Sequence, residues 1–172
     1  RTEVWLYLAN AYLGADRPTQ AAMALEVAEK LGRKDLSTSL TLGDIYTNLE
    51  MIEPAQQKYL TALELNASGA LKALPRAIDS WIRLEAWQAT ERLIKQASAS
   101  PEWNSLSVAD RSHWIRLEAM VAIQQGKDAT AENVLLQALE LNPLDGSIAL
   151  ELARFYVRQE KWSQAASFFS RA

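Results

Sequence analysis

Hydrophobic residues along this chain recur at intervals of three and four positions, which is the spacing of an amphipathic α-helix. Near the N-terminus, Trp5, Leu8, Ala9 and Tyr12 stand at positions i, i+3, i+4 and i+7, so they share one helical face. Gly and Pro are scarce, with 6 and 5 residues, whereas helix-forming residues are abundant. The pattern therefore predicts an all-α protein.

A short motif recurs along the chain. It consists of a leucine, a small residue directly after it and an aromatic residue three positions later, followed after nine more residues by an alanine. Copies of the first part are Leu8-Ala9-x-x-Tyr12, Leu42-Gly43-x-x-Tyr46 and Leu152-Ala153-x-x-Tyr156, and the alanines are Ala21, Ala55 and Ala165. A further copy carries Ala119, Ala131, Leu135, Ala138 and Pro143. Ala21 and Ala55 are 34 residues apart, as are Ala131 and Ala165.

This motif resembles the tetratricopeptide repeat, whose pattern is W-x2-L-G-x2-Y, then A-x3-F-x2-A and a closing proline. The resemblance covers nearly the whole chain and implies a right-handed α-solenoid of antiparallel helix pairs, a tetratricopeptide superhelix. We expect a single array over residues 1–172 and interpret the chain as a fragment of a longer protein. The expected repeats are about 2–35, 36–69, 71–104 and 112–145, with a truncated fifth at 146–172 and an insertion at about 105–111.

Helix boundaries are predicted from proline, glycine and capping residues. Pro75 falls inside the expected first helix of the third repeat, so it must kink that helix or delay its start. Ser107 and Asp110 approximate a capping box, which predicts a helix from about 108 to 125. Asp145 is expected to cap the helix that follows it. Glycines expected at helix ends or in turns are Gly32, Gly69 and Gly126.

Two local features leave alternatives open. Glu118 replaces the leucine that the family carries, and it is either a buried acid paired with Arg83 or Arg111, or a solvated side chain. Trp103 and Trp114 flank the insertion and form either an apolar contact surface or the packing that closes a long loop. The other tryptophans that fit packing positions of the repeat are Trp5, Trp81, Trp87 and Trp162.

The composition argues against several classes of function. Net charge is -3, which disfavours a general nucleic-acid-binding protein. The absence of cysteine excludes disulfides, thiolate metal ligands and a cysteine nucleophile, and a single histidine, His113, excludes a histidine pair for zinc. No apolar run approaches the roughly 18 residues of a membrane span. We expect neither enzymatic activity nor a metal or cofactor.

The resemblance implies instead that the first helix of each repeat lines a concave groove that binds a peptide or protein. Candidate groove residues are Tyr7, Asn10, Asp44, Asn48, Lys72, Arg76, Asp79, Arg83, Arg116, Met120, Arg154 and Arg158. Cations gather in the last three repeats, so an acidic stretch or a terminal carboxylate of the peptide would meet the arginines. Asn10 and Asn48 would hydrogen-bond its backbone. The alternative is that these charges only solvate the inner wall.

These observations favour a non-catalytic protein–protein interaction module within a larger scaffold or adaptor. One alternative is a structural spacer or a self-associating array, because Phe168 and Phe169 on the last helix would be exposed without a following repeat. A regulatory segment of an enzyme is another. The composition, rich in Ala, Gln and Trp, is interpreted as bacterial, and it leaves cytoplasm and periplasm equally open.

Overall fold

The computed structural model describes residues 2–172. Those residues form eleven α-helices and one 3-10 helix without any strand, which confirms the all-α prediction. The chain divides into two compact units, residues 1–103 and Asn104–Ala172. Each unit is described by itself, and the expected single array stays a prediction.

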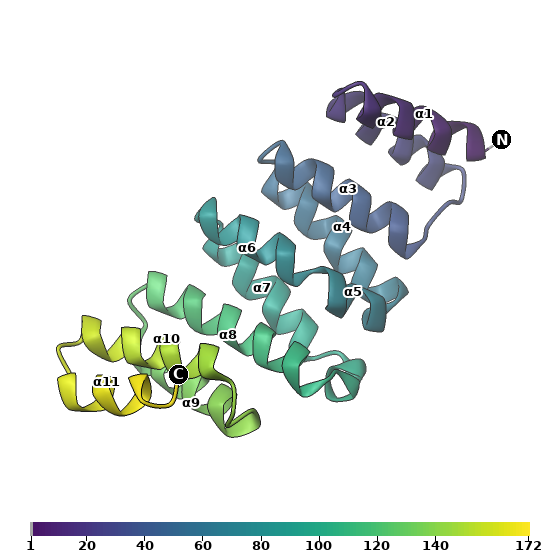
Figure 1. The fold of residues 1–172 in the computed structure, drawn as a ribbon. Helices are drawn as coiled ribbons and strands as arrows, with labels where there is room; N and C mark the ends of the chain where they lie inside the picture. The colour runs from purple at the N-terminus through teal and green to yellow at the C-terminus, as the bar shows by residue number, and fades with distance from the viewer. Residues whose placement is uncertain (1) are drawn as a thin grey trace. The chain divides into compact units, whose positions relative to one another are not determined.

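The first unit consists of helical hairpins. Its helices are α1 (Thr2–Gly14), α2 (Pro18–Lys30), α3 (Leu36–Asn48), α4 (Ile52–Leu65), α5 (Ala67–Ala73), α6 (Pro75–Arg83) and α7 (Trp87–Ser98). The hairpins are α1 with α2, α3 with α4, and α6 with α7 (Figure 1). Helix α2 lies against α3, α3 against α6, and α4 against α7, so consecutive hairpins within this unit are in contact. A 3-10 helix, Pro101–Ser105, follows α7.

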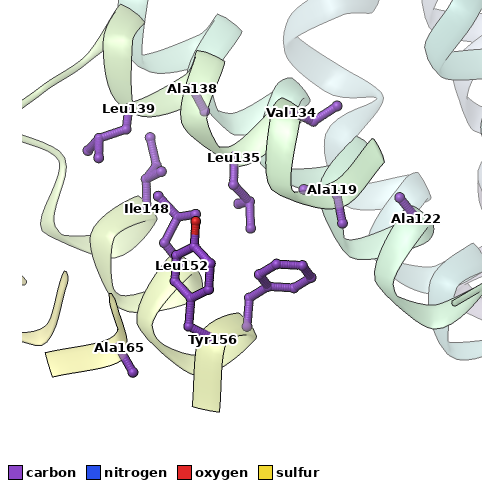
Figure 2. Close-up of a cluster of buried hydrophobic side chains, with 12 residues drawn as sticks. Ala119, Ala122, Val134, Leu135, Ala138, Leu139, Ile148, Leu152, Tyr156 and Ala165 are labelled. Atoms are coloured by element: carbon purple, nitrogen blue, oxygen red, sulfur yellow. The ribbon is translucent and has the colours of Figure 1, made fainter. Parts of the chain in front are cut away.

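The second unit contains two hairpins. They are formed by α8 (Val108–Gln124) with α9 (Asp128–Leu141), and by α10 (Gly146–Arg158) with α11 (Trp162–Phe169); α9 also lies against α10. Figure 2 shows the apolar cluster that these helices enclose. Ile148, Leu152 and Leu135 are fully buried in it, with alanines where helices approach closely. One cluster thus joins both hairpins of this unit.

The hairpin turns share one backbone geometry at equivalent positions of the sequence motif. In each turn the N–H of the residue that follows a positive-φ residue donates to a carbonyl five positions back. The pairs are Arg17 to Tyr12, Met51 to Tyr46, Ala86 to Trp81, Lys127 to Ala122 and Lys161 to Tyr156, at 2.8–2.9 Å. The positive-φ residues are Asp16, Glu50, Glu85, Gly126 and Glu160, with φ of 56–69°. The acceptor is the position of the repeat that carries the aromatic residue in four of the five copies.

Capping and proline predictions are largely confirmed. Pro75 is the first residue of α6, and a separate short helix, α5, ends just before it, so the first helix of the third repeat is interrupted. Ser107 caps α8 by accepting from the Asp110 N–H at 3.1 Å, and Asp145 caps α10 by accepting from the Ser147 N–H at 3.0 Å. Gly69 is a correction: it lies in the first turn of α5, where its N–H donates to Asn66, and is no C-terminal cap.

The remaining side-chain expectations have mixed outcomes. Trp81 and Trp114 are fully buried, so Trp114 belongs to the core and forms no contact surface. Trp162 was expected in the core, but it is 63% exposed, because it is the first residue of α11 and no described helix covers it. Glu118 is exposed, which favours its solvated alternative, but partial burial of the carboxyl group raises its pKa. Phe169 on α11 is 47% exposed.

Candidate functional site

Five of the candidate residues come together in one groove of the first unit. The groove has a volume of about 480 Å³ and lies where α3 and α6 run beside each other above α4. Its lining consists of Asp44, Thr47 and Asn48 from α3, Tyr59 from α4, and Arg76, Ala77, Asp79, Ser80 and Arg83 from α6. The predicted members are Asp44, Asn48, Arg76, Asp79 and Arg83.

The floor of the groove is aromatic, and a glycine makes room for it. The rings of Tyr59 and Trp81 are buried with centroids 5.5 Å apart and tilted by 49°. A Cβ atom on Gly43 would overlap the Tyr59 ring, so only glycine fits at that position of α3. This close approach brings the Tyr59 hydroxyl up between α3 and α6. The small position of the repeat therefore determines the depth of the groove.

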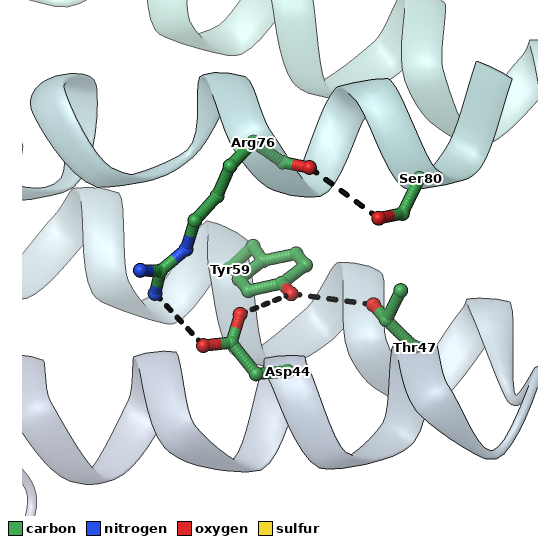
Figure 3. Close-up of polar contacts among 5 residues, drawn as sticks. All are labelled: Asp44, Thr47, Tyr59, Arg76 and Ser80. Carbon is green, nitrogen blue, oxygen red and sulfur yellow. Dashed lines mark hydrogen bonds and ion pairs between the residues drawn. The ribbon is translucent and has the colours of Figure 1, made fainter.

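A chain of hydrogen bonds runs along the floor (Figure 3). Trp81 Nε1 donates to Thr47 Oγ1 at 3.0 Å, the hydroxyls of Thr47 and Tyr59 are 3.2 Å apart, and Tyr59 donates to Asp44 Oδ1 at 2.8 Å. An indole N–H can only donate and a carboxylate can only accept. The direction is therefore fixed, and Thr47 donates to Tyr59.

The ionisation of Tyr59 is consistent with that direction. Burial raises the pKa of Tyr59 above its ordinary value of 10.0, and the neighbouring Asp44 charge raises it further. The Tyr59 phenol is therefore protonated at neutral pH, and it can donate to Asp44. Each polar group of the chain has its partner, which is the condition for burying such groups without a large penalty.

The rim of the groove carries the charges. Arg76 donates to Asp44 Oδ2 at 2.9 Å, across from α6 to α3 (Figure 3). Arg83 donates to Ser80 Oγ at 2.9 Å, and Ser80 donates to the Arg76 carbonyl at 3.4 Å. Arg76 was predicted to be available to a peptide carboxylate, whereas in the structure it is already paired with an acid.

The other candidates of the first unit lie elsewhere. Asn10 lines a smaller hollow of about 150 Å³ together with Leu6 from α1 and Thr41 from α3. Tyr7 is 75% exposed on α1, and Lys72 is exposed on α5; neither lines these two hollows. Asn10 thus lies beside α3, and the binding roles of Asn10, Tyr7 and Lys72 stay predictions.

Two of the four candidates in the second unit already have polar partners. Arg116 on α8 donates to His113 Nδ1 at 3.2 Å, and Arg154 on α10 lies 3.5 Å from Glu151. Met120 is half-buried on α8, and Arg158 is exposed on α10. Their role in binding stays a prediction.

Four of the nine lining residues are not among the predicted members, and these are Thr47, Tyr59, Ala77 and Ser80. The available signal was that Tyr59 occupies a position where other copies carry Leu25 and Leu135, opposite Gly43 instead of an alanine. A hydroxyl on a packing residue indicates that this residue also has a polar partner.

Within residues 2–172, no helix is both long and apolar enough to cross a membrane. No cluster of three or more histidine or acidic side chains is placed there to hold a metal ion. A larger open hollow of about 790 Å³ lies between the C-terminal halves of α4 and α7; no candidate residue contributes to it.

Comparison with known proteins gives the fold. No protein-family model and no curated protein matches the chain. Among solved structures, PilF of Pseudomonas aeruginosa matches with a TM-score of 0.61 at 19% identity, over 99% of this chain and 74% of that one. MamA from Desulfovibrio magneticus RS-1 matches with a TM-score of 0.65 at 14% identity, over 99% and 92%. PilW, described as a widely conserved type IV pilus biogenesis factor, matches with a TM-score of 0.59 at 21% identity, over 99% and 75%.

These solved structures are tetratricopeptide-repeat proteins. The fold of this chain is tetratricopeptide-like. At these identities the likeness shows the fold alone, so function is argued from the groove.

Proposed function

We propose that this tetratricopeptide-like chain is a non-catalytic protein–protein interaction module, part of a larger scaffold or adaptor. It binds a peptide or an exposed segment of a partner in the groove between α3 and α6. The observation that carries the proposal is that five groove residues predicted from the repeat line one hollow of about 480 Å³. A hollow of that size accepts a few side chains of a bound segment.

The lining suits an extended backbone. Asn48 is exposed at the rim, and its side-chain amide can donate to a peptide carbonyl and accept from a peptide N–H. Ala77 leaves space beside the Tyr59 hydroxyl on the floor, so a side chain of the segment can enter. Main-chain hydrogen bonds then supply affinity, and the charged rim supplies specificity.

In the second unit, Arg116, Arg154 and Arg158 are the groups that we propose for an acidic stretch of the partner. Exchange of the His113 and Glu151 contacts for a peptide carboxylate would provide charge-assisted hydrogen bonds. Changing Arg116 and Arg154 to Glu should abolish binding of a partner that uses this surface, and unchanged affinity would exclude its use.

The groove itself is tested by filling it. Immobilised protein is incubated with an equimolar library of acetylated, amidated ten-residue peptides, and retained peptides are identified by mass spectrometry. Ser80→Trp places a large side chain in the groove, whereas the control Ser98→Trp adds the same side chain on the exposed end of α7. We expect retention to fall at least tenfold for the first variant only. Equal retention by both variants would contradict groove binding.

One observation favours a second candidate function, self-association through α11. Trp162 and Phe169 expose a large part of their apolar surface there, and Phe169 occupies the position at which Leu25, Tyr59 and Leu135 are buried. Light scattering over a concentration series would show a dimer that Trp162→Glu with Phe169→Glu dissociates. Phe168 is unsuitable for this test, because it stacks on Tyr156 with centroids 5.6 Å apart. A monomer at all concentrations would exclude this candidate.

A further inference from the structure

The groove between α3 and α6 is not basic, although the sequence suggested an acid-binding surface. Two acids, Asp44 and Asp79, and two arginines, Arg76 and Arg83, line it, so the formal charges cancel. A run of acidic residues entering this groove would meet two carboxylates as well as two guanidinium groups. Affinity for such a run is therefore not what the lining favours.

The first of these charge pairs is committed to holding the helices together. Asp44 accepts from Tyr59 on one oxygen and from Arg76 on the other. The chain of buried hydrogen bonds that begins at Trp81 and passes through Thr47 also ends at the Asp44 carboxylate. These hydrogen bonds fix the orientation of the carboxylate. Asp44 and Arg76 thus join α3 to α6 with a defined geometry. A ligand carboxylate that approached Arg76 would meet the Asp44 carboxylate beside it, whose other oxygen is held by Tyr59.

The second pair is available. Asp79 and Arg83 stand one helical turn apart on α6, a spacing at which opposite charges can pair. Arg83 instead turns to the neutral hydroxyl of Ser80, which leaves most of its N–H donors unused. Within residues 2–172, no hydrogen bond or ion pair engages the carboxylate of Asp79. One acceptor and one donor of full charge therefore face the groove side by side.

We propose that this groove selects a dipolar segment, in which a lysine or arginine side chain binds Asp79 and a neighbouring glutamate or aspartate side chain binds Arg83. The inference rests on the proposed function and narrows its partner. Asn48 across the groove then holds the backbone between the two charged side chains. A segment with acids alone would place a carboxylate against Asp79 without compensation, and a segment with bases alone would do the same at Arg83.

The test uses the complete chain and defined peptides. Four acetylated, amidated ten-residue peptides share one scaffold and carry at two central positions Lys with Glu, Glu with Lys, Glu with Glu, or Gln with Gln. Fluorescence anisotropy with each labelled peptide gives the affinities. We expect one of the two dipolar peptides to bind at least tenfold more tightly than the Glu–Glu and Gln–Gln peptides.

An exchange of the two charges provides the decisive variant. Asp79→Arg combined with Arg83→Asp keeps the net charge of the protein, and it should invert the preference between the two dipolar peptides. Lys95→Gln, on the exposed side of α7, is the control for a change of charge outside the groove and should leave the preference unchanged. Circular dichroism checks that both proteins are folded; both exchanged side chains reach the surface.

The outcomes separate the two levels of the proposal. If the Glu–Glu peptide binds most tightly and Ser80→Trp abolishes this binding, the dipolar preference is overturned, whereas binding in the groove is not. Equal affinity for all four peptides, with binding abolished by Ser80→Trp, would also overturn the dipolar preference but not binding in the groove. Binding that Ser80→Trp leaves unchanged, or no binding of any peptide, including those of the ten-residue library, would overturn both.

Discussion

The interface between α3, α4 and α6 and the core of α8–α11 solve the same packing problem in different ways. In the second unit an apolar cluster lies between the hairpins, and hydrogen bonds at its edge also join them, from Tyr156 on α10 to Glu132 on α9 at 2.7 Å and from Ser112 on α8 to Asp145 at 3.3 Å. In the first unit, a hydrogen-bonded chain is buried between hairpins and ends at a groove. Apolar packing tolerates small shifts of one helix against another, whereas a chain of directed hydrogen bonds fixes the position of one helix against the other. The groove lies at the interface where hydrogen bonds fix this position.

This difference explains why the groove has a defined chemistry. Polar side chains of α3 and α6 line the space above Tyr59. Apolar helix faces at the same place would be more stable in closer contact, because the stabilising free energy grows with the apolar area that is buried. The comparison therefore predicts that the second unit is sensitive to lost volume and the first to lost hydrogen bonds.

Loss of volume in the second unit should have the largest effect. Leu152→Ala removes a fully buried side chain from the centre of the apolar cluster, and we expect the free energy of unfolding to fall by about 3 kcal/mol. Guanidinium unfolding followed by circular dichroism measures the loss. Leu144→Ala, at a side chain that is 95% exposed, should change it by less than about 0.5 kcal/mol. Equal losses would contradict the packing described.

Added volume under the groove should come next. Gly43→Ala drives a methyl group into the Tyr59 ring, and the hydrogen bonds of Tyr59 resist a shift of that ring. We expect a net loss of about 2 kcal/mol, although alanine is the better helix former. The double variant with Tyr59→Leu should tolerate the added methyl group, because Leu25 and Leu135 stand opposite Ala9 and Ala119 in other copies. A loss that Tyr59→Leu fails to relieve would exclude this contact as the cause.

The hydrogen-bonded chain itself is tested at Thr47. Thr47→Val keeps the shape of the side chain but leaves the buried Trp81 N–H without an acceptor, so we expect a loss of about 1.5 kcal/mol. Thr47→Ser retains the hydroxyl and is the matched control. The indole N–H resonance of Trp81 in nuclear magnetic resonance spectra would report the change locally alongside the unfolding curve. A valine variant as stable as the serine variant would show that the chain contributes nothing to stability.

The pattern of the sequence was sufficient for the fold and for part of the groove. Spacing of apolar residues gave the hairpins, and Ser107 and Asp145 gave two helix starts, because these signals act within one turn of helix. The pairing of Asp44 with Arg76 joins residues 32 positions apart on different hairpins. No local signal specifies which rotamer a surface arginine adopts, so its engagement was not predictable.

The backbone conformation of the turns was likewise not fully predictable from local sequence signals. Glycine was expected to mark them, and Gly126 does so with a φ of 69°. Asp16, Glu50, Glu85 and Glu160 adopt the same left-handed geometry at the equivalent positions. Tertiary context imposes this conformation on residues that do not favour it, and propensity alone could not reveal it.

Asp145 connects capping with pH. The hydrogen bond from Ser147 is the largest cause that keeps the pKa of Asp145 below its ordinary value of 3.8 in the folded state. The cap therefore stabilises the second unit fully above about pH 4, and this contribution is lost as pH falls further. Asp145→Ala should lower the free energy of unfolding by about 1 kcal/mol at pH 7 and by less at pH 3. Asp145→Asn keeps a capping oxygen without the titration, so a pH dependence equal to that of the unsubstituted protein would contradict the assignment.

The smallest effect on stability is expected at the hairpin turns, where the left-handed position carries glutamate in one turn of the first unit and glycine in one turn of the second. Glu85 in the first unit and Gly126 in the second adopt the same turn, with φ of 56° and 69°. A side chain in this left-handed region costs about 1–2 kcal/mol, while glycine costs about 0.5–1 kcal/mol of additional backbone entropy. Glu85→Gly should therefore raise the free energy of unfolding by about 0.5 kcal/mol, and Gly126→Ala should lower it by a similar amount. Thermal unfolding resolves the two signs, and a loss of stability in both variants would mean that the Glu85 side chain has a stabilising role that outweighs its backbone strain.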